Sequence, residues 1–242
     1  MKKLILAFIA LVFSFGFTSD NVITVKGSDT MVILAQRWAE VYMSKNSDVT
    51  IQVTGGGSGV GIAALINGST DLCNSSRPMK PSEREKLKQR YNTLGVEIKV
   101  AKDGLSIYEN AAGSISELTM DQIKDIYTGK ITNWKDVGGP NAKIIVYGRE
   151  NSSGTYVYFK DNVIVGADFT SSMQSMPGTA AVVNAVSKDR YAIGFGGAAY
   201  AKGIKFIKVK KDANSPGYEP IAENVKSGVY PISRFLYIYT RS

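Results

Sequence analysis

Three turns in the chain place glycine and hydroxyl residues directly between a β-forming run and a helical pattern. They are Gly27-Ser28-Asp29-Thr30, Gly55-Gly56-Gly57-Ser58-Gly59 and Arg149-Glu150-Asn151-Ser152-Ser153-Gly154-Thr155. A helix N-terminus presents unpaired N–H groups and about half a positive charge, and hydroxyls add short donors. Arg149 would add a bidentate, charge-assisted contact. Any one such turn is also typical of an ordinary helix cap, but their recurrence favours an oxyanion site.

The composition excludes several other kinds of chemistry. The 242 residues contain no histidine and one cysteine. A Ser-His-Asp or Cys-His catalytic group, a histidine-containing zinc site and an intrachain disulfide are therefore impossible. The glycine run has neither the Gly-Lys-Ser/Thr of a Walker loop nor the spacing of a dinucleotide fingerprint. We predict no catalytic residues, no metal site and no cofactor.

The N-terminus is typical of a secretory signal peptide. Lys2 and Lys3 precede the apolar stretch Leu4–Phe17, which is shorter than the ~20 residues of a membrane span. We assign residues 1–19 to this signal peptide; an uncleaved anchor helix is the alternative. No cysteine lies near the boundary, so we expect a periplasmic protein without a lipid anchor. The formal net charge of +8 is spread out, with no basic run interleaved with aromatics, and predicts no nucleic-acid partner.

The anion-binding turns need a scaffold, and alternating strand and helix patterns predict one. Strands are expected at 21–26, 49–53, 96–101, 105–108, 143–147, 192–195, 204–209 and 236–240. Helices are expected at 31–43, 59–67, 81–91, 119–128, 153–161 and 179–187. This alternation predicts an α/β fold with mainly parallel sheets, whose ligands bind at the carboxyl ends of strands. The run 96–108 contains Lys102-Asp103-Gly104 but no helix, which suits a crossover between two sheets.

Further motifs narrow the class of protein. They are Ser75–Met79 (Ser-Ser-Arg-Pro-Met), Thr128–Trp134 (Thr-Gly-Lys-Ile-Thr-Asn-Trp), Gly178–Val182 and Tyr230–Arg234. Together with the three turns, they make the chain resemble the phosphate-binding proteins of bacterial phosphate-specific ABC transport systems. These proteins have the type II periplasmic binding-protein fold. The resemblance covers about residues 22–240.

The resemblance implies two α/β lobes, each a mainly parallel sheet flanked by helices, with phosphate in the cleft between them. We expect lobe 1 over residues 20–103 and 202–242, lobe 2 over 104–201, and a hinge near Asp103-Gly104 and Ala198–Lys202. The implied ligand set is Thr30, Met31, Ser58, Ser76, Arg149, Ser153, Gly154 and Thr155, with Ser28, Asp29 and Arg77 as possible additions. The implied partners are inorganic phosphate and a membrane-embedded ABC permease. The protein would be a monomer and not an enzyme.

Two features depart from the family pattern. The best-known members have an aspartate at the position of Ser76, which accepts the proton that bound phosphate keeps and sulfate lacks; Ser76 or Asp29 would take that role here. Arg77 would either add a second positive contact or form an ion pair at the surface. Members also usually continue with a helix after the strand matching Leu236–Thr240, whereas this sequence stops at Ser242. We therefore expect an incompletely covered apolar face on lobe 1.

Three alternative functions stay open at this point. The same turns could bind another oxyanion, such as sulfate or molybdate. A secreted phosphatase could use them to hold its substrate, although the chain offers no histidine base. A surface or adhesion role is the third alternative.

Overall fold

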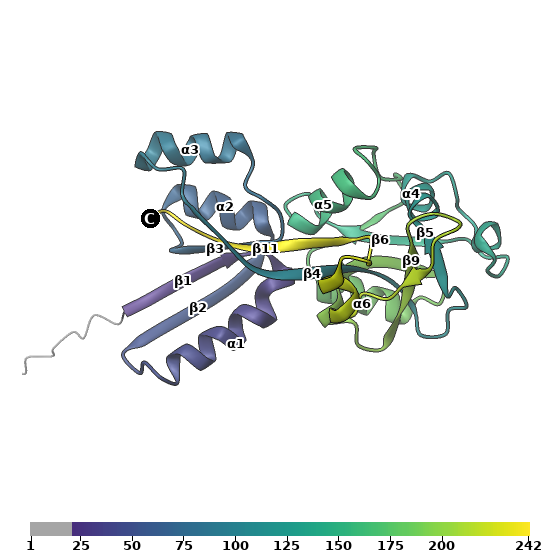
Figure 1. Cartoon of the computed structure of the whole chain (residues 1–242), viewed down its shortest axis with the longest axis horizontal. Helices are drawn as coiled ribbons and strands as arrows, with labels where there is room; N and C mark the ends of the chain where they lie inside the picture. Colours follow the sequence, from purple (N-terminus) through teal and green to yellow (C-terminus); the bar gives the residue numbers. More distant parts are fainter. Residues whose placement is uncertain (1–20) are drawn as a thin grey trace, which may run out of the picture.

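The N-terminal lobe is built on three parallel strands, β1 (Asn21–Gly27), β2 (Val49–Gly56) and β3 (Leu72–Ser75). The computed structural model describes residues 21–242, so the predicted signal peptide lies outside the described residues. Helix α1 (Val32–Met43) covers one face of this sheet, and α2 (Ser58–Asn67) and α3 (Pro81–Tyr91) cover the other (Figure 1). Cys73 is fully buried in the core between the sheet and α2 and α3, as a small hydrophobic residue would be.

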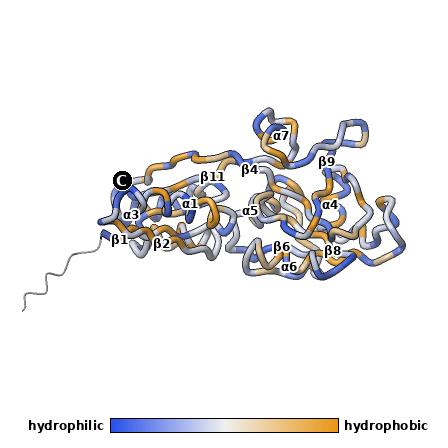
Figure 2. The backbone as a smooth tube through the Cα atoms, turned by 90° about the horizontal axis from the view of Figure 1, so that it is seen from below, coloured by the Kyte–Doolittle hydropathy of each residue, from blue (hydrophilic) through white to orange (hydrophobic). Residues whose placement is uncertain are grey.

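Two long strands connect the lobes. Strand β4 (Val96–Asn110) is continuous through Lys102-Asp103-Gly104, where two shorter strands were predicted. Its first half pairs with β11 (Ser233–Thr240), and its second half pairs with β8 (Ala192–Gly197) and β9 (Ile204–Lys210). Both views show β4 and β11 running between the lobes (Figures 1 and 2). The predicted crossover is therefore confirmed as an uninterrupted strand.

The second lobe surrounds the far half of β4. Its remaining strands are β5 (Glu117–Thr119), β6 (Ile145–Arg149), β7 (Gln174–Met176) and β10 (Gly217–Tyr218). Its helices are α4 (Met120–Thr128), α5 (Gly154–Asn162), α6 (Thr179–Lys188) and α7 (Ala222–Ser227). Parallel pairs join β6 to β7 and β8, and β5 to β9, whereas the crossover strands β4 and β11 run antiparallel to their neighbours. The strand β10 also pairs with β9 in the antiparallel sense, so the fold is mixed α/β, with parallel pairs in both lobes.

The core of the second lobe is aromatic. The rings of Phe159 and Phe195 stack 4.0 Å apart, and Tyr127 packs edge-on against both. Trp134 is buried beside them and donates from its indole N–H to the carbonyl of Tyr191. Val146 of β6 and Phe195 of β8 belong to this core, which therefore supports the strand that ends at Arg149.

The chain returns from lobe 2 to lobe 1 at a later residue than predicted. Residues 202–242 were assigned to lobe 1, but β9 pairs with the lobe-2 half of β4 and with β5. Ile207, Val225 and Ile232 are also buried in the core of lobe 2. The chain therefore crosses back only with β11, and the second connection lies at Ile232–Ser233 rather than at Ala198–Lys202. The pattern of β9 predicts a strand but carries no information about its pairing partner.

Part of the apolar surface of lobe 1 is exposed. Trp38 and Tyr42 of α1 are 39% and 47% exposed, although Trp38 was predicted to be a core residue. They border an apolar groove that also contains Val25 and Ile238. None of the helices in the described part of the chain has the length and apolar character needed to cross a membrane.

Candidate anion-binding site

The N-termini of α2 and α5 meet where the lobes touch. The Gly59 N–H donates to the Ser152 carbonyl over 2.9 Å, which joins the second predicted turn to the third. Gly57, before α2, has φ +98°, and an added Cβ there would lie 2.7 Å from the Ser152 carbonyl oxygen. Glycine is therefore required at Gly57 both by its backbone conformation and by the close approach of the other lobe.

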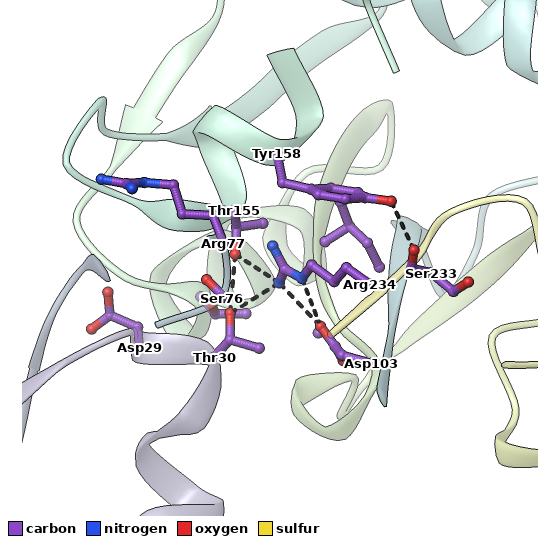
Figure 3. Close-up of polar contacts among 12 residues, drawn as sticks. Asp29, Thr30, Ser76, Arg77, Asp103, Thr155, Tyr158, Ser233 and Arg234 are labelled. Atoms are coloured by element: carbon purple, nitrogen blue, oxygen red, sulfur yellow. Dashed lines mark hydrogen bonds and ion pairs between the residues drawn. The ribbon is translucent and has the colours of Figure 1, made fainter. Parts of the chain in front are cut away.

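Buried hydroxyl groups gather around this junction from both lobes. Ser58 Oγ lies 3.2 Å from Ser76 Oγ and accepts the Ser76 N–H at 3.0 Å. Thr30 Oγ1 of lobe 1 lies 3.0 Å from Thr155 Oγ1 of lobe 2 (Figure 3). Gly154, which directly precedes Thr155, lies against the serine pair, because its ideal Cβ would be 2.2 Å from Ser58 Oγ and 2.7 Å from Ser76 Oγ. The structure thus brings together five residues of the predicted ligand set.

Three other predicted residues support the turns. Ser153 caps α5, and its hydroxyl oxygen accepts the N–H groups of Thr155 (3.1 Å) and Tyr156 (3.3 Å). Met31 is fully buried, and its N–H donates to the Ser28 carbonyl at 3.0 Å. Ser28 is itself buried, and its N–H donates to the Asn74 carbonyl. In this arrangement the Met31 N–H is used within its own turn.

Arg149 is buried and forms an ion pair across the lobe junction. Its Nη2 lies 2.5 Å from Asp29 Oδ2, and its Nη1 donates to Thr179 Oγ1 at 2.9 Å. Its Nε has no hydrogen-bond partner among the described residues. The other Asp29 oxygen accepts the Gly56 N–H at 3.1 Å, and the Tyr200 hydroxyl donates to the Asp29 carbonyl. Asp29 therefore ties the first turn to Arg149, to the second turn and to the segment after β8.

Arg77 forms an ion pair rather than facing the hydroxyl groups. Its Nη1 and Nη2 donate to the two carboxylate oxygens of Glu83 at 2.8 and 2.7 Å. Of the two predictions for Arg77, the ion pair is therefore correct, but the pair is not at the surface, since the Arg77 side chain is only 7% exposed. Burial raises the pKa of Glu83, but hydrogen bonds from Arg77 and the Lys80 N–H outweigh it and hold the pKa below its ordinary value.

A second arginine at the junction was absent from the prediction. Arg234 of β11 donates from Nη2 to Thr155 Oγ1 at 3.0 Å and to Thr30 Oγ1 at 3.3 Å (Figure 3). It also pairs with Asp103 of β4, with Nε and Nη2 at 3.1 and 3.0 Å from Oδ2. The available signal was that the charged Arg234 directly precedes the apolar run Phe235–Tyr239 and belongs to a motif that carried the family resemblance.

The comparisons with known proteins place this geometry in a class. The pattern of the PBP superfamily domain matches residues 18–242. "Phosphate-binding protein PstS" of Pseudomonas aeruginosa is 34% identical over 226 residues, which cover 88% of this chain and 70% of that protein. The protein of the same name from Staphylococcus saprophyticus is 35% identical over 221 residues, covering 88% and 68%.

Solved structures agree with the sequence relatives. A phosphate ABC transporter substrate-binding protein from Clostridium perfringens, solved with bound phosphate, has a TM-score of 0.82 and 30% identity, over 91% of this chain and 86% of that one. An ABC-type phosphate transport receptor from Vibrio cholerae has a TM-score of 0.70 and 30% identity, over 91% and 87%. The fold is therefore that of the two-lobed type II periplasmic binding proteins. The chain belongs to the PstS family of phosphate-binding proteins.

These relatives are substrate-binding proteins rather than enzymes. Within residues 21–242, no group of three or more cysteine, aspartate or glutamate side chains gathers that could hold a metal ion. The chemistry of the junction is that of hydrogen-bond donors and guanidinium groups, which suits an oxyanion.

Proposed function

We propose that this protein captures inorganic phosphate between its lobes and delivers it to a membrane-embedded ABC permease. The observation that carries the proposal is the meeting of buried hydroxyl groups from both lobes beside a buried arginine. The names of the P. aeruginosa and S. saprophyticus relatives and the phosphate bound in the C. perfringens structure support the choice of phosphate.

The residues at the junction can satisfy a tetrahedral oxyanion without a metal ion. The hydroxyls of Thr30, Ser58 and Thr155 would donate to different phosphate oxygens, together with Ser76. The N-terminus of α5, at Gly154, would add backbone N–H donors and its partial positive charge. The Nε–H of Arg149 would add the charged contact, since that atom is buried without a partner in the described part of the chain. Exclusion of water strengthens each of these contacts.

Closure of the lobes would assemble this set. Contacts that join the lobes in the structure include Thr30 with Thr155, Gly59 with Ser152, and Asp29 with Arg149. We place the hinge where the crossover strands pass side by side, at Gly104 and Ser233, which are paired in register. Opening there would separate the hydroxyl groups and release the anion.

The remaining predictions belong to this proposal. We expect residues 1–19 to act as a signal peptide, the mature protein to be periplasmic and monomeric, and the binding cycle to need no cofactor. We also expect no catalytic turnover.

Calorimetric titration of the mature chain, from about Asp20, with phosphate and then with sulfate tests the function. Saturable one-site binding of phosphate supports it. Equal binding of sulfate would favour a broader oxyanion receptor. Binding of neither anion by a chain that melts cooperatively would overturn the proposal. Release of phosphate from a model phosphoester above the blank rate would instead favour the phosphatase alternative.

A further inference from the structure

We infer that Arg234 is a second arginine of the phosphate site and contacts the bound anion directly through Nη1. This inference rests on the proposed function and deepens it. The residue comes from crossover strand β11, whereas the predicted ligand residues all come from the turns of the two lobes. The site would therefore hold the anion between Arg149 of lobe 2 and Arg234 at the base of the cleft.

The position of Arg234 links it to the predicted ligand set. Its side chain is 3% exposed, and its Nη2 donates to one threonine from each lobe, Thr30 and Thr155. Figure 3 shows the guanidinium between these hydroxyls and Asp103, with Ser76 nearby. Because both threonine oxygens accept from Arg234, and only one threonine can donate to the other, at least one hydroxyl hydrogen remains for the anion.

The unused part of the guanidinium points to a ligand. Nη1 of Arg234 is buried and has no hydrogen-bond partner among residues 21–242. A buried polar group left without a partner destabilises the fold, and a charged group does so more strongly. Arg77 differs, because its two terminal nitrogens are both bound to Glu83. Arg234 therefore has a terminal –NH₂ group without a partner among residues 21–242, on the same guanidinium that binds Thr30 and Thr155.

Neighbouring residues hold the guanidinium in this orientation. Asp103 binds Nε and Nη2, which leaves Nη1 as the free end. The Tyr158 ring lies 5.3 Å from Arg234 Cζ, and the Tyr158 hydroxyl donates to the Ser233 carbonyl at 2.9 Å. Asp103 and Tyr158 are thus positioning residues, and Arg234 is the residue that touches the anion.

The test compares phosphate affinity by calorimetry in the mature wild-type chain and in Arg234→Gln, Arg234→Lys and Arg84→Gln. Loss of a charge-assisted contact should weaken phosphate binding about 30- to 300-fold in Arg234→Gln, with partial recovery in Arg234→Lys. Arg84 is the matched control, because it pairs with Glu97 at 2.6 Å on the outer side of lobe 1. We expect Arg84→Gln to bind phosphate within about twofold of wild type.

Two further measurements separate contact from structural support. The double variant Asp103→Asn, Arg234→Gln removes both charges of the buried pair, so it tests the arginine without leaving an unpaired carboxylate. In the ¹⁵N-arginine-labelled wild-type chain, phosphate should shift the Arg234 side-chain resonances and leave those of Arg84 unchanged.

The results distinguish failure of the inference about Arg234 from failure of the proposed function. Wild-type phosphate affinity in Arg234→Gln or in the double variant, or no phosphate-induced shift of the Arg234 resonances, overturns the inference and leaves the proposed function standing. Failure of the folded wild-type chain to bind phosphate overturns both.

Discussion

Replacing Gly154 with alanine should block closure of the lobes without unfolding either one. An ideal Cβ at this position would lie 2.2 Å from Ser58 Oγ, 2.8 Å from Ser58 Cβ and 2.7 Å from Ser76 Oγ. Ser58 and Ser76 belong to lobe 1, whereas Gly154 begins α5 of lobe 2. The clash therefore exists only in the closed form. Alanine also suits the first turn of a helix better than glycine does.

The size of the effect follows from the contacts. A hydroxyl can rotate away, but Ser58 Cβ is attached to the backbone and cannot. Overpacking of this kind costs about 1–3 kcal/mol, which would weaken phosphate binding by about 5- to 150-fold if binding requires closure. Calorimetry measures the affinity, and small-angle scattering measures whether phosphate still compacts the molecule.

Gly178→Ala is the matched control for this substitution. It lies directly before α6, and no atom lies within 4 Å of its ideal Cβ. We expect it to close and bind phosphate as wild type does. Wild-type affinity and compaction in Gly154→Ala would refute the reasoning, because the lobes could then not meet at Gly154 and Ser58 in the bound form.

Three further predictions follow. Arg149→Ala should weaken phosphate binding by about 2–4 kcal/mol, measured by calorimetry, because a charged donor is lost and Asp29 loses its partner. Ser76→Asp should restore the proton acceptor of the family and lower sulfate affinity about tenfold or more relative to phosphate affinity in competition binding. The pKa of Glu83 is lower in the folded protein than its ordinary value of 4.5. Its pairing with Arg77 therefore stabilises the fold above pH 4.5, and this contribution is lost as the pH falls through the pKa of the folded state. Glu83→Gln should therefore cost about 1–3 kcal/mol of unfolding free energy at neutral pH and flatten the acid limb of the urea-unfolding profile; an unchanged acid limb would contradict this.

The meeting of the three turns could be predicted from local sequence. The three turns were identified from glycine and hydroxyl residues alone, and the structure brings all three to one junction. This worked because a helix N-terminus is a local feature, with donors set by consecutive residues such as Ser153, Gly154 and Thr155. The continuity of β4 through Asp103 was harder to see, because Lys-Asp-Gly is also typical of a turn.

The parts that were missed depend on contacts between distant residues. Arg234 and Asp103 are 131 positions apart, and only the pairing of β11 with β4 places them opposite each other. The assignment of β9 to lobe 1 was wrong for the same reason, since its apolar pattern is compatible with either sheet. The alternatives for Arg77 also depended on tertiary structure, because its conformation is set by Glu83 on the following helix.

The two buried ion pairs of the site differ in how closure would affect them. Asp29 and Arg149 lie on different lobes, so their contact can form only when the lobes meet. Asp103 and Arg234 face each other in register on the two crossover strands, so their contact persists while the lobes move. Each arginine carries its own carboxylate, which limits the cost of burying its charge. Under this arrangement Arg234 would attract phosphate into the open cleft, and Arg149 would hold the anion once the lobes close. In stopped-flow measurements we therefore expect loss of Arg234 to slow phosphate association and loss of Arg149 mainly to speed phosphate dissociation.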